Sequence, residues 1–195
     1  MNVLEQALRR IAGDLDRRDR KWALVGGFAV SARAEPRFTR DVDVAVAVKD
    51  DEAAEQLVRS LLADGYRLLA SVEQDATGRL ATVRLAPPGP ADDLVVVDAL
   101  FASSGIEPEL VRAGEAIEVL PELTVPVART GHLIALKLLA RDDERRPQDL
   151  GDLRALLEVA GEEELDLAGA AVRLIAQRGF ARGRDLEAAL AELMA

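Results

Sequence analysis

Two carboxylates that lie two residues apart are the first candidates for chemistry. Asp41 and Asp43 open the valine-rich run DVDVAVAV, whose alternation predicts a β-strand. Residues two apart on a strand face the same way, so these carboxylates lie about 7 Å apart and repel each other unless a cation lies between them. The pair indicates an oxygen-ligand site for Mg²⁺, which binds one or two carboxylates together with substrate phosphates. The alternative is an acidic edge strand that faces solvent.

A third carboxylate, Asp98, lies inside the apolar run LVVVDALF, which is typical of a central strand. Burial of an ionised carboxylate is costly unless it is paired or bound to a metal. A place beside Asp41 and Asp43 would offset that cost through a shared metal. The alternative is a strand-end residue that reaches water or an arginine.

A glycine pair, Gly26 and Gly27, follows the apolar run 22–25 and precedes a predicted short helix at 28–33. Glycines between a strand and a helix let phosphates approach the backbone, where the helix N-terminus favours negative charge. The pair stands fourteen residues before Asp41, although such pairs also mark ordinary turns. Arg37 and Thr39 continue the row of Asp41 along the predicted strand.

Basic residues near the middle of the chain form a second candidate group. Lys137, Arg141 and Arg145 lie at i, i+4 and i+8, so one helix face would be basic if the helix extends that far. That face could neutralise a triphosphate or guide an RNA backbone; solvated charges beside an apolar face are the alternative. Asp149 and Asp152 lie in the first turns of the next predicted helix, where acids favour the helix dipole, so capping is the alternative to a functional role. His132 is expected to be a cap or core residue.

Composition limits the classes of site. The 195 residues carry 25 basic and 35 acidic side chains, a net charge of −10, which argues against broad, charge-driven nucleic-acid binding. The absence of cysteine excludes disulfides, thiolate zinc sites and a cysteine nucleophile, and a single histidine excludes a multi-histidine metal site. We find no signal peptide and no apolar stretch long enough to span a bilayer, so we expect a cytoplasmic protein.

The elements that must position these residues follow from periodicity and turn signals. A mixed α/β part is expected over residues 1–129 and a helical region over 130–195. Helices are predicted at 2–18, 28–33, 50–64, 108–113, 131–141, 147–159, 165–177 and 184–193. Strands are predicted at 22–25, 37–48, 66–72, 79–85, 94–101, 117–120 and 124–127, with a hairpin across 75–78 and an exposed loop at 86–93.

The stretch GGFAVSARAEPRFTRDVDV, with the later lone Asp98, resembles the nucleotidyltransferase AbiEii/AbiGii toxin family of the DNA polymerase β-like superfamily. In that family an R-x-T-x-D-x-D stretch follows the glycine turn. A later lysine-then-aspartate pattern has candidates in Lys137 and Asp149. Many active members of the superfamily carry Gly-Ser at the turn, whereas the second residue here is Gly27, so nucleotide binding would rest on backbone amides.

The resemblance implies an α/β nucleotidyltransferase fold, with a mixed sheet flanked by helices and a C-terminal helical region. It implies transfer of a nucleoside monophosphate from an NTP, with Mg²⁺ or Mn²⁺ on Asp41, Asp43 and Asp98. Nucleotide contacts would come from the turn and the basic residues that follow it, with Lys137 on the leaving pyrophosphate: Gly26, Gly27, Arg37, Thr39, Arg40 and Lys137.

The acceptor would be a tRNA 3′ end, and the protein a toxin with a separately encoded antitoxin. A protein hydroxyl and a small antibiotic are the alternative acceptors. A module that binds nucleotide or a partner protein without turnover is the alternative from another class. The sequence leaves open the preferred NTP, the acceptor, the antitoxin and the oligomeric state.

Overall fold

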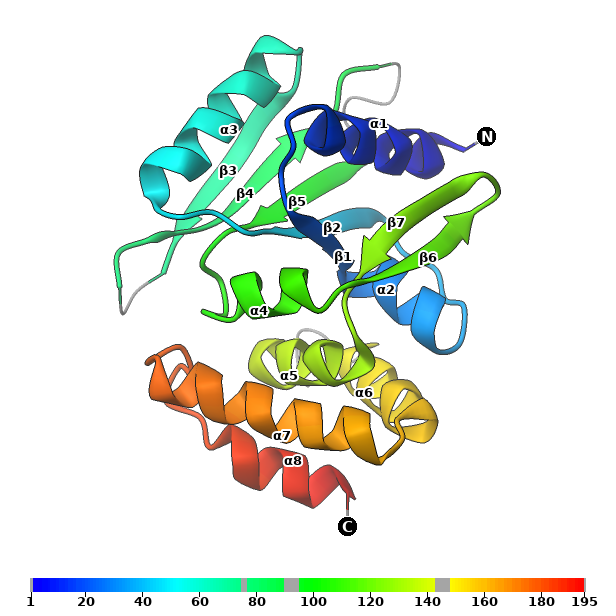
Figure 1. Cartoon of the computed structure of the whole chain (residues 1–195), viewed down its shortest axis with the longest axis vertical. Coiled ribbons are helices and arrows are strands. Elements are labelled where there is room, and N and C mark those ends of the chain that lie inside the picture. Colours follow the sequence, from blue (N-terminus) through cyan, green and yellow to red (C-terminus); the bar gives the residue numbers. More distant parts are fainter. Residues whose placement is uncertain (1, 75–76, 90–94, 143–147, 195) are drawn as a thin grey trace.

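The computed structural model describes residues 2–74, 77–89, 95–142 and 148–194. Its centre is a seven-stranded mixed sheet in the order β3-β4-β5-β2-β1-β7-β6 (Figure 1). The strands are β1 (Trp22–Val25), β2 (Asp41–Val46), β3 (Arg67–Glu73), β4 (Leu80–Ala86), β5 (Val96–Leu100), β6 (Glu115–Leu120) and β7 (Leu123–Val127).

Some helices cover the sheet, and the C-terminal helices form a separate stack beside it. They are α1 (Val3–Arg17), α2 (Gly26–Arg33), α3 (Asp51–Ala63), α4 (Glu107–Arg112), α5 (Thr130–Ala140), α6 (Gln148–Val159), α7 (Glu162–Gln177) and α8 (Leu186–Met194). In Figure 1, α1 and α3 lie above the sheet, and α5 to α8 lie below it, with α4 in between. None of the helices in the described ranges is long and apolar enough to cross a membrane.

The three strands at the centre bring the acidic residues together. β2 pairs antiparallel with β1 and parallel with β5, and β5 pairs antiparallel with β4. Val42 and Val44 of β2 are fully buried, because the valines of DVDV alternate with the aspartates and point into the core. The aspartates therefore share the other face of the strand.

One continuous hydrophobic core includes buried side chains from both parts of the chain, from Leu8 in α1 to Leu190 in α8. It is almost wholly aliphatic, as the low aromatic content predicts. The division at residues 129 and 130 stays a prediction.

The predicted elements agree with the structure in type and order, and three of the differences at their ends concern the site. β2 begins at Asp41, so Arg37 and Thr39 lie in the preceding loop and not on the strand. α2 begins earlier than predicted, at Gly26 itself. α5 ends at Ala140, and Arg141 takes an extended conformation, so the predicted continuous basic face is wrong. Arg145 lies outside the described residues.

The predicted hairpin is confirmed, since β3 and β4 pair antiparallel and the backbone amide of Gln74 donates to the carbonyl of Arg79 at 2.8 Å. The loop at 86–93 was expected to be exposed, but Ala86 ends β4 and is buried, as is Pro87. Residues 75–76 and 90–93 lie outside the described ranges.

Candidate active site

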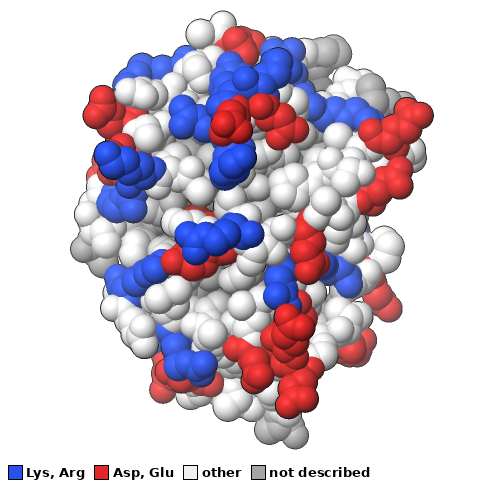
Figure 2. Space-filling view, viewed as in Figure 1, with Lys and Arg blue, Asp and Glu red and all other residues white. Residues whose placement is uncertain are grey.

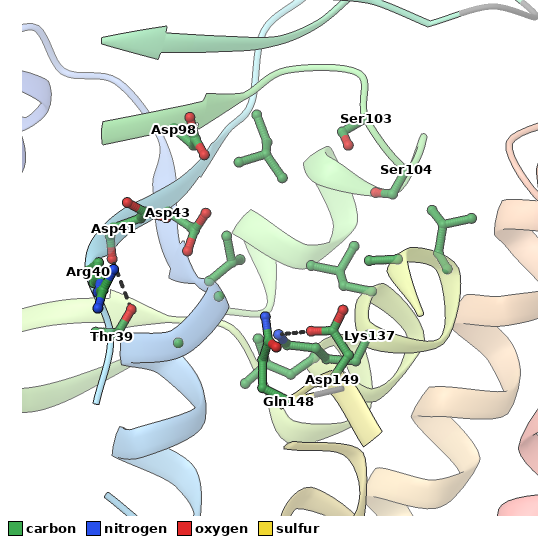
Figure 3. Close-up of a pocket in the computed structure, with 18 of the residues that line it drawn as sticks. Thr39, Arg40, Asp41, Asp43, Asp98, Ser103, Ser104, Lys137, Gln148 and Asp149 are labelled. Atoms are coloured by element: carbon green, nitrogen blue, oxygen red, sulfur yellow. Dashed lines mark hydrogen bonds and ion pairs between the residues drawn. The ribbon is translucent and has the colours of Figure 1, made fainter. Parts of the chain in front are cut away.

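A cavity of about 540 Å³ lies between the central strands and the helices α5 and α6. Figure 3 shows Asp41, Asp43 and Asp98 on neighbouring strands along one wall, with Lys137 and Asp149 on the wall opposite. Most of the residues predicted for the site line this cavity: Gly26, Gly27, Arg37, Thr39, Arg40, Asp41, Asp43, Asp98, Lys137 and Asp149.

The glycine turn packs against the acidic strand too closely for side chains. Gly26 has a φ of +63°, and a Cβ there would lie 1.9 Å from Oδ2 of Asp43. A Cβ on Gly27 would lie 2.6 Å from Oγ1 of Thr39 and 2.9 Å from Nη2 of Arg37. Both glycines are therefore required by the approach of the loop and of β2.

Asp43 is the carboxylate that packs against the glycine turn. It is the register partner of Val25 on β1 and of Asp98 on β5, so β2 holds it between the glycine turn and the third carboxylate. Burial, followed by the charges of Asp98 and Asp41, raises the pKa of Asp43 to about 7, although Lys137 and the Gly27 backbone act in the opposite direction. The two neighbouring carboxylates thus add to the effect of burial.

Asp98 is 8% exposed and makes a bidentate ion pair with Arg84 of β4, its neighbour across the strand pair. Arg84 Nε donates to Oδ1 at 2.9 Å, and Nη2 donates to Oδ2 at 2.7 Å. The carboxylates of Asp98, Asp43 and Asp41 in turn raise the pKa of Arg84 above its ordinary value. Within the described residues, no three acidic or histidine side chains are arranged to hold a metal ion.

Arg84 was missed at the sequence level. Its one signal is a charged residue inside the apolar, alternating run LATVRLA. The sequence left open that Asp98 reaches an arginine, and the register between β4 and β5 identifies which one.

Lys137 lies on the opposite wall and is held by two carboxylates. Its Nζ lies 2.8 Å from Oδ1 of Asp149 and 2.8 Å from Oδ2 of Asp152, both at the start of α6. Arg37 also reaches Asp152, with 2.6 Å between Nε and Oδ1. These pairs join the loop before β2 to α5 and α6, and they give Asp149 and Asp152 a role beyond the helix capping that the sequence offered as the alternative.

The rim of the cavity is formed by the loop before β2. The Thr39 hydroxyl donates to the backbone carbonyl of Asp41 at 3.3 Å. Phe38 is 79% exposed, and the guanidinium of Arg40 lies 5.7 Å from the centre of its ring. Further lining residues that the sequence did not indicate are Ser103, Ser104, Gln148 and Arg182.

Arg141, a candidate site residue, and His132, an expected cap or core residue, take no part in lining this cavity. Arg141 follows the last residue of α5, and its carbonyl accepts a hydrogen bond from Arg184. His132 is a buried residue of α5, as expected for a core position, and its Nδ1 has no hydrogen-bond partner among the described residues. Desolvation lowers the pKa of His132.

Comparison with solved structures finds the same fold. The solution structure of the antibiotic-resistance factor ANT(2″)-Ia has a TM-score of 0.57 and 19% identity, covering 91% of this chain and 96% of that chain. An antigenic nucleotidyltransferase-like protein from Paracoccidioides brasiliensis has a TM-score of 0.55 and 19% identity, covering 96% and 92%. The lincosamide antibiotic adenylyltransferase LnuA has a TM-score of 0.50 and 14% identity, covering 82% and 100%.

No curated protein sequence matches the chain. The family model described as "Nucleotidyl transferase AbiEii toxin, Type IV TA system" matches residues 6–194, which is nearly the whole chain. The resemblance in the glycine turn and the aspartate strand is thereby confirmed, together with the nucleotidyltransferase fold. The chain is a nucleotidyltransferase that belongs to the AbiEii toxin family of type IV toxin–antitoxin systems.

Proposed function

We propose that this protein transfers a nucleoside monophosphate from an NTP to an acceptor hydroxyl and releases pyrophosphate in a metal-dependent reaction. The observation that carries the proposal is the common cavity, where a glycine turn faces Asp41 and Asp43 with Asp98 beside them. A triphosphate needs backbone donors and cations, and acidic side chains beside it need a metal to offset their charge.

The residues fit a divalent cation. Asp41 and Asp43 offer hard oxygen ligands from one face of β2, and burial, followed by the charges of Asp98 and Asp41, raises the pKa of Asp43, so its ionised form lacks full compensation. Mg²⁺ or Mn²⁺ bound there would polarise the phosphoryl oxygens and neutralise charge as it develops. Asp98 is the proposed third ligand, and its binding to a metal requires an exchange of partners with Arg84.

Other polar groups of the cavity would bind the phosphates and stabilise the charge of the leaving group. The turn at Gly26 and Gly27 offers backbone amides to the phosphates, with Arg37, Thr39 and Arg40 beside them at the rim. Lys137 supplies positive charge for the leaving pyrophosphate. In the structure Asp149 and Asp152 hold its amino group, so these two acids act as positioning residues in the proposal. Arg141 and Arg145 remain lower-ranked candidates for phosphate or RNA contacts.

The acceptor we favour is a tRNA 3′ end, as the family resemblance implies, in the cytoplasm of a cell that also encodes an antitoxin. On the face seen in Figure 2, acidic and basic side chains are interspersed, so an RNA would be held locally rather than along a broad basic surface. Two of the structural neighbours, an antibiotic-resistance factor and a lincosamide antibiotic adenylyltransferase, support a small antibiotic as the second candidate acceptor. A protein hydroxyl is a third.

The test is incubation of the purified protein with each α-labelled NTP and Mg²⁺, in the presence of total RNA, total protein or a panel of antibiotics. We expect label in the RNA fraction, with equimolar release of pyrophosphate. Label in the antibiotic fraction or in the protein fraction would identify that molecule as the acceptor in place of tRNA. If the protein binds nucleotide but releases no pyrophosphate in any of the incubations, it is a binding module and not a transferase.

A further inference from the structure

One aromatic side chain, Phe38, is exposed in a chain that packs its other aromatic residues inside. The sequence has four phenylalanines, one tryptophan and one tyrosine. Phe38 is 79% exposed, the largest exposed fraction among the large apolar side chains that the described residues leave in solvent. The remaining aromatic residues lie in the hydrophobic core or pack against it: Trp22, Phe28, Tyr66, Phe101 and Phe180. The packing of the fold therefore does not account for Phe38.

The place of Phe38 distinguishes it from the other exposed apolar residues. Single exposed apolar side chains are ordinary on a protein surface, but among those of the described residues Phe38 alone lines the candidate active-site cavity. Its neighbours Arg37 and Thr39 face the glycine turn, since a Cβ on Gly27 would meet both of them. Phe38 thus lies one residue from the groups proposed to surround the phosphates. The other exposed apolar residues lie on α1, β3, α6 and α8: Val3, Leu68, Leu69, Val72, Val159 and Met194.

The backbone around Phe38 is held in place although its side chain is exposed. The carbonyl of Phe38 accepts a hydrogen bond from Nη1 of Arg37 at 3.0 Å, and the same guanidinium pairs with Asp152 of α6. The backbone amide of Arg37 donates to Oγ of Ser31 in α2 at 3.1 Å. The loop therefore presents the ring from a fixed position, which lowers the entropy lost when a ligand packs against it.

A cation lies next to the exposed ring. Cζ of Arg40 is 5.7 Å from the centre of the Phe38 ring, which is within cation–π range. Figure 3 shows Arg40 beside Thr39 and Asp41 at one edge of the cavity. Aromatic rings and guanidinium planes are the groups on which proteins stack unpaired nucleobases, because every base has a π face. An apolar protein segment docked here would instead desolvate Arg40 without compensation.

We propose that Phe38, flanked by Arg40, stacks on a nucleobase at the mouth of the cavity. This inference rests on the proposed function, because it takes the glycine turn to hold the phosphates of a nucleotide. The base belongs either to the bound NTP or to the unpaired end of an RNA acceptor, and the stacking chemistry is the same in both. Since stacking tolerates every base, Phe38 adds affinity and positions the sugar, and it does not select among the NTPs.

Calorimetric titration with Mg²⁺ separates the base from the phosphates when inorganic tripolyphosphate is compared with a non-hydrolysable NTP analogue and a single-stranded RNA trinucleotide. Phe38→Ala should weaken binding of the ligand whose base is stacked by about 10-fold or more and leave tripolyphosphate binding unchanged. Phe38→Trp should retain the affinity, whereas Phe38→Leu keeps apolar bulk without a π face and should behave as Phe38→Ala does. Val159→Ala, at an exposed position on α6 outside the cavity, should change none of these affinities.

Fluorescence of the Phe38→Trp variant identifies the source of the base. The native tryptophan, Trp22, is buried, and its Nε1 donates to Oδ1 of Asp16 at 2.8 Å, so the introduced indole is the exposed one. The NTP analogue should quench this indole if the NTP supplies the stacked base, and the RNA trinucleotide should quench it if the acceptor does. Tripolyphosphate has no base and should not quench it, and the unmodified chain should show no quenching with any of the three ligands.

Because the Phe38 side chain is exposed, each variant should unfold at the Tm of the unmodified chain. The inference is overturned if Phe38→Ala binds both the NTP analogue and the trinucleotide as tightly as the unmodified chain does, or if neither ligand quenches the introduced indole. Tripolyphosphate binding in those same variants would leave the proposed phosphate site standing. If neither tripolyphosphate nor the NTP analogue binds the unmodified chain, the proposed function fails, and this inference fails with it.

Discussion

The two walls of the cavity are built in different ways. The wall of Asp41, Asp43 and Asp98 is set by strand register, since adjacent strands place these residues beside each other and beside the glycine turn. The wall of Lys137 is set by side-chain ion pairs with Asp149 and Asp152 from the next helix. On the acidic wall, backbone pairing holds like charges side by side. On the lysine wall, the carboxylates of Asp149 and Asp152 balance the charge of Lys137. The proposed function therefore places the external cation at the acidic wall and not at the lysine wall.

The largest expected effect comes from the acidic wall. Asp43→Asn should reduce nucleotidyl transfer by roughly three orders of magnitude or more, since it removes one charge of the proposed metal site. The free energy of unfolding should increase, because the folded state carries one buried like charge less. A radiolabel transfer assay and thermal melts in metal-free buffer check the two effects.

The pH dependence gives the sign of that stabilisation. The folded pKa of Asp43, about 7, lies above the ordinary value of 3.8, so ionisation of this carboxyl destabilises the fold, and stability falls as the pH rises through this interval. The gain from Asp43→Asn should be small near pH 4 and largest above pH 7. A Tm difference that is the same at both ends, or a loss of stability at pH 8, would contradict this assignment.

The lysine wall should respond in the opposite sense. Lys137→Ala leaves the carboxylates of Asp149 and Asp152 buried without their cation, so stability should fall by about 2–4 kcal/mol. Transfer should also fall, by about 100-fold, and Lys137→Arg should restore stability more completely than activity because the guanidinium has a different shape. Urea unfolding and kcat measurements separate the two. Unchanged stability in Lys137→Ala would show that the ion pairs contribute nothing.

The glycine turn offers a matched pair of substitutions. Gly26→Ala meets a positive φ and an Asp43 oxygen at 1.9 Å, so it should destabilise the fold by about 2–3 kcal/mol and weaken NTP binding. Gly151→Ala, inside α6 with no heavy atom within 4 Å of its Cβ, should be neutral or stabilising by up to about 1 kcal/mol. Equal Tm values for the two variants would remove the steric explanation of the turn.

The smallest effect concerns His132, which lies outside the cavity. Desolvation lowers its folded pKa, so the neutral form stabilises the fold above the unfolded pKa, about 6.5, and this stability is lost as the pH falls toward the folded pKa. His132→Leu should flatten the dependence of Tm on pH below 6.5 and leave transfer unchanged. The same slope in both proteins would show that His132 does not titrate in this interval.

Local patterns made the acidic wall predictable. The alternation in DVDVAVAV placed Asp41 and Asp43 on one face, and the apolar run around Asp98 indicated a central strand, both of which the structure has. Gly26 and Gly27 were identified as a strand-to-helix turn because they lie between an apolar run and a predicted short helix. These features depend on periods of two residues and on turn chemistry, which a single sequence displays.

Long-range pairing made the rest unpredictable. Arg84 reaches Asp98 only because β4 pairs with β5, and Asp152 holds Lys137 and Arg37 only because α6 packs beside α5 and α2. The periodicity of residues 131–141 also could not show that α5 ends at Ala140, so the basic face that included Arg141 was overextended.

In the proposed function, the glycine turn and the acidic wall form one metal-dependent NTP site. The most direct measurement is isothermal titration calorimetry of non-hydrolysable NTP analogues, with and without Mg²⁺, on the unmodified chain and on Asp41→Asn and Asp43→Asn. We predict that Mg²⁺ strengthens binding at least 10-fold in the unmodified chain and has no such effect in either variant. Binding of equal strength without Mg²⁺, or an Mg²⁺ effect that survives both substitutions, would contradict the proposed site.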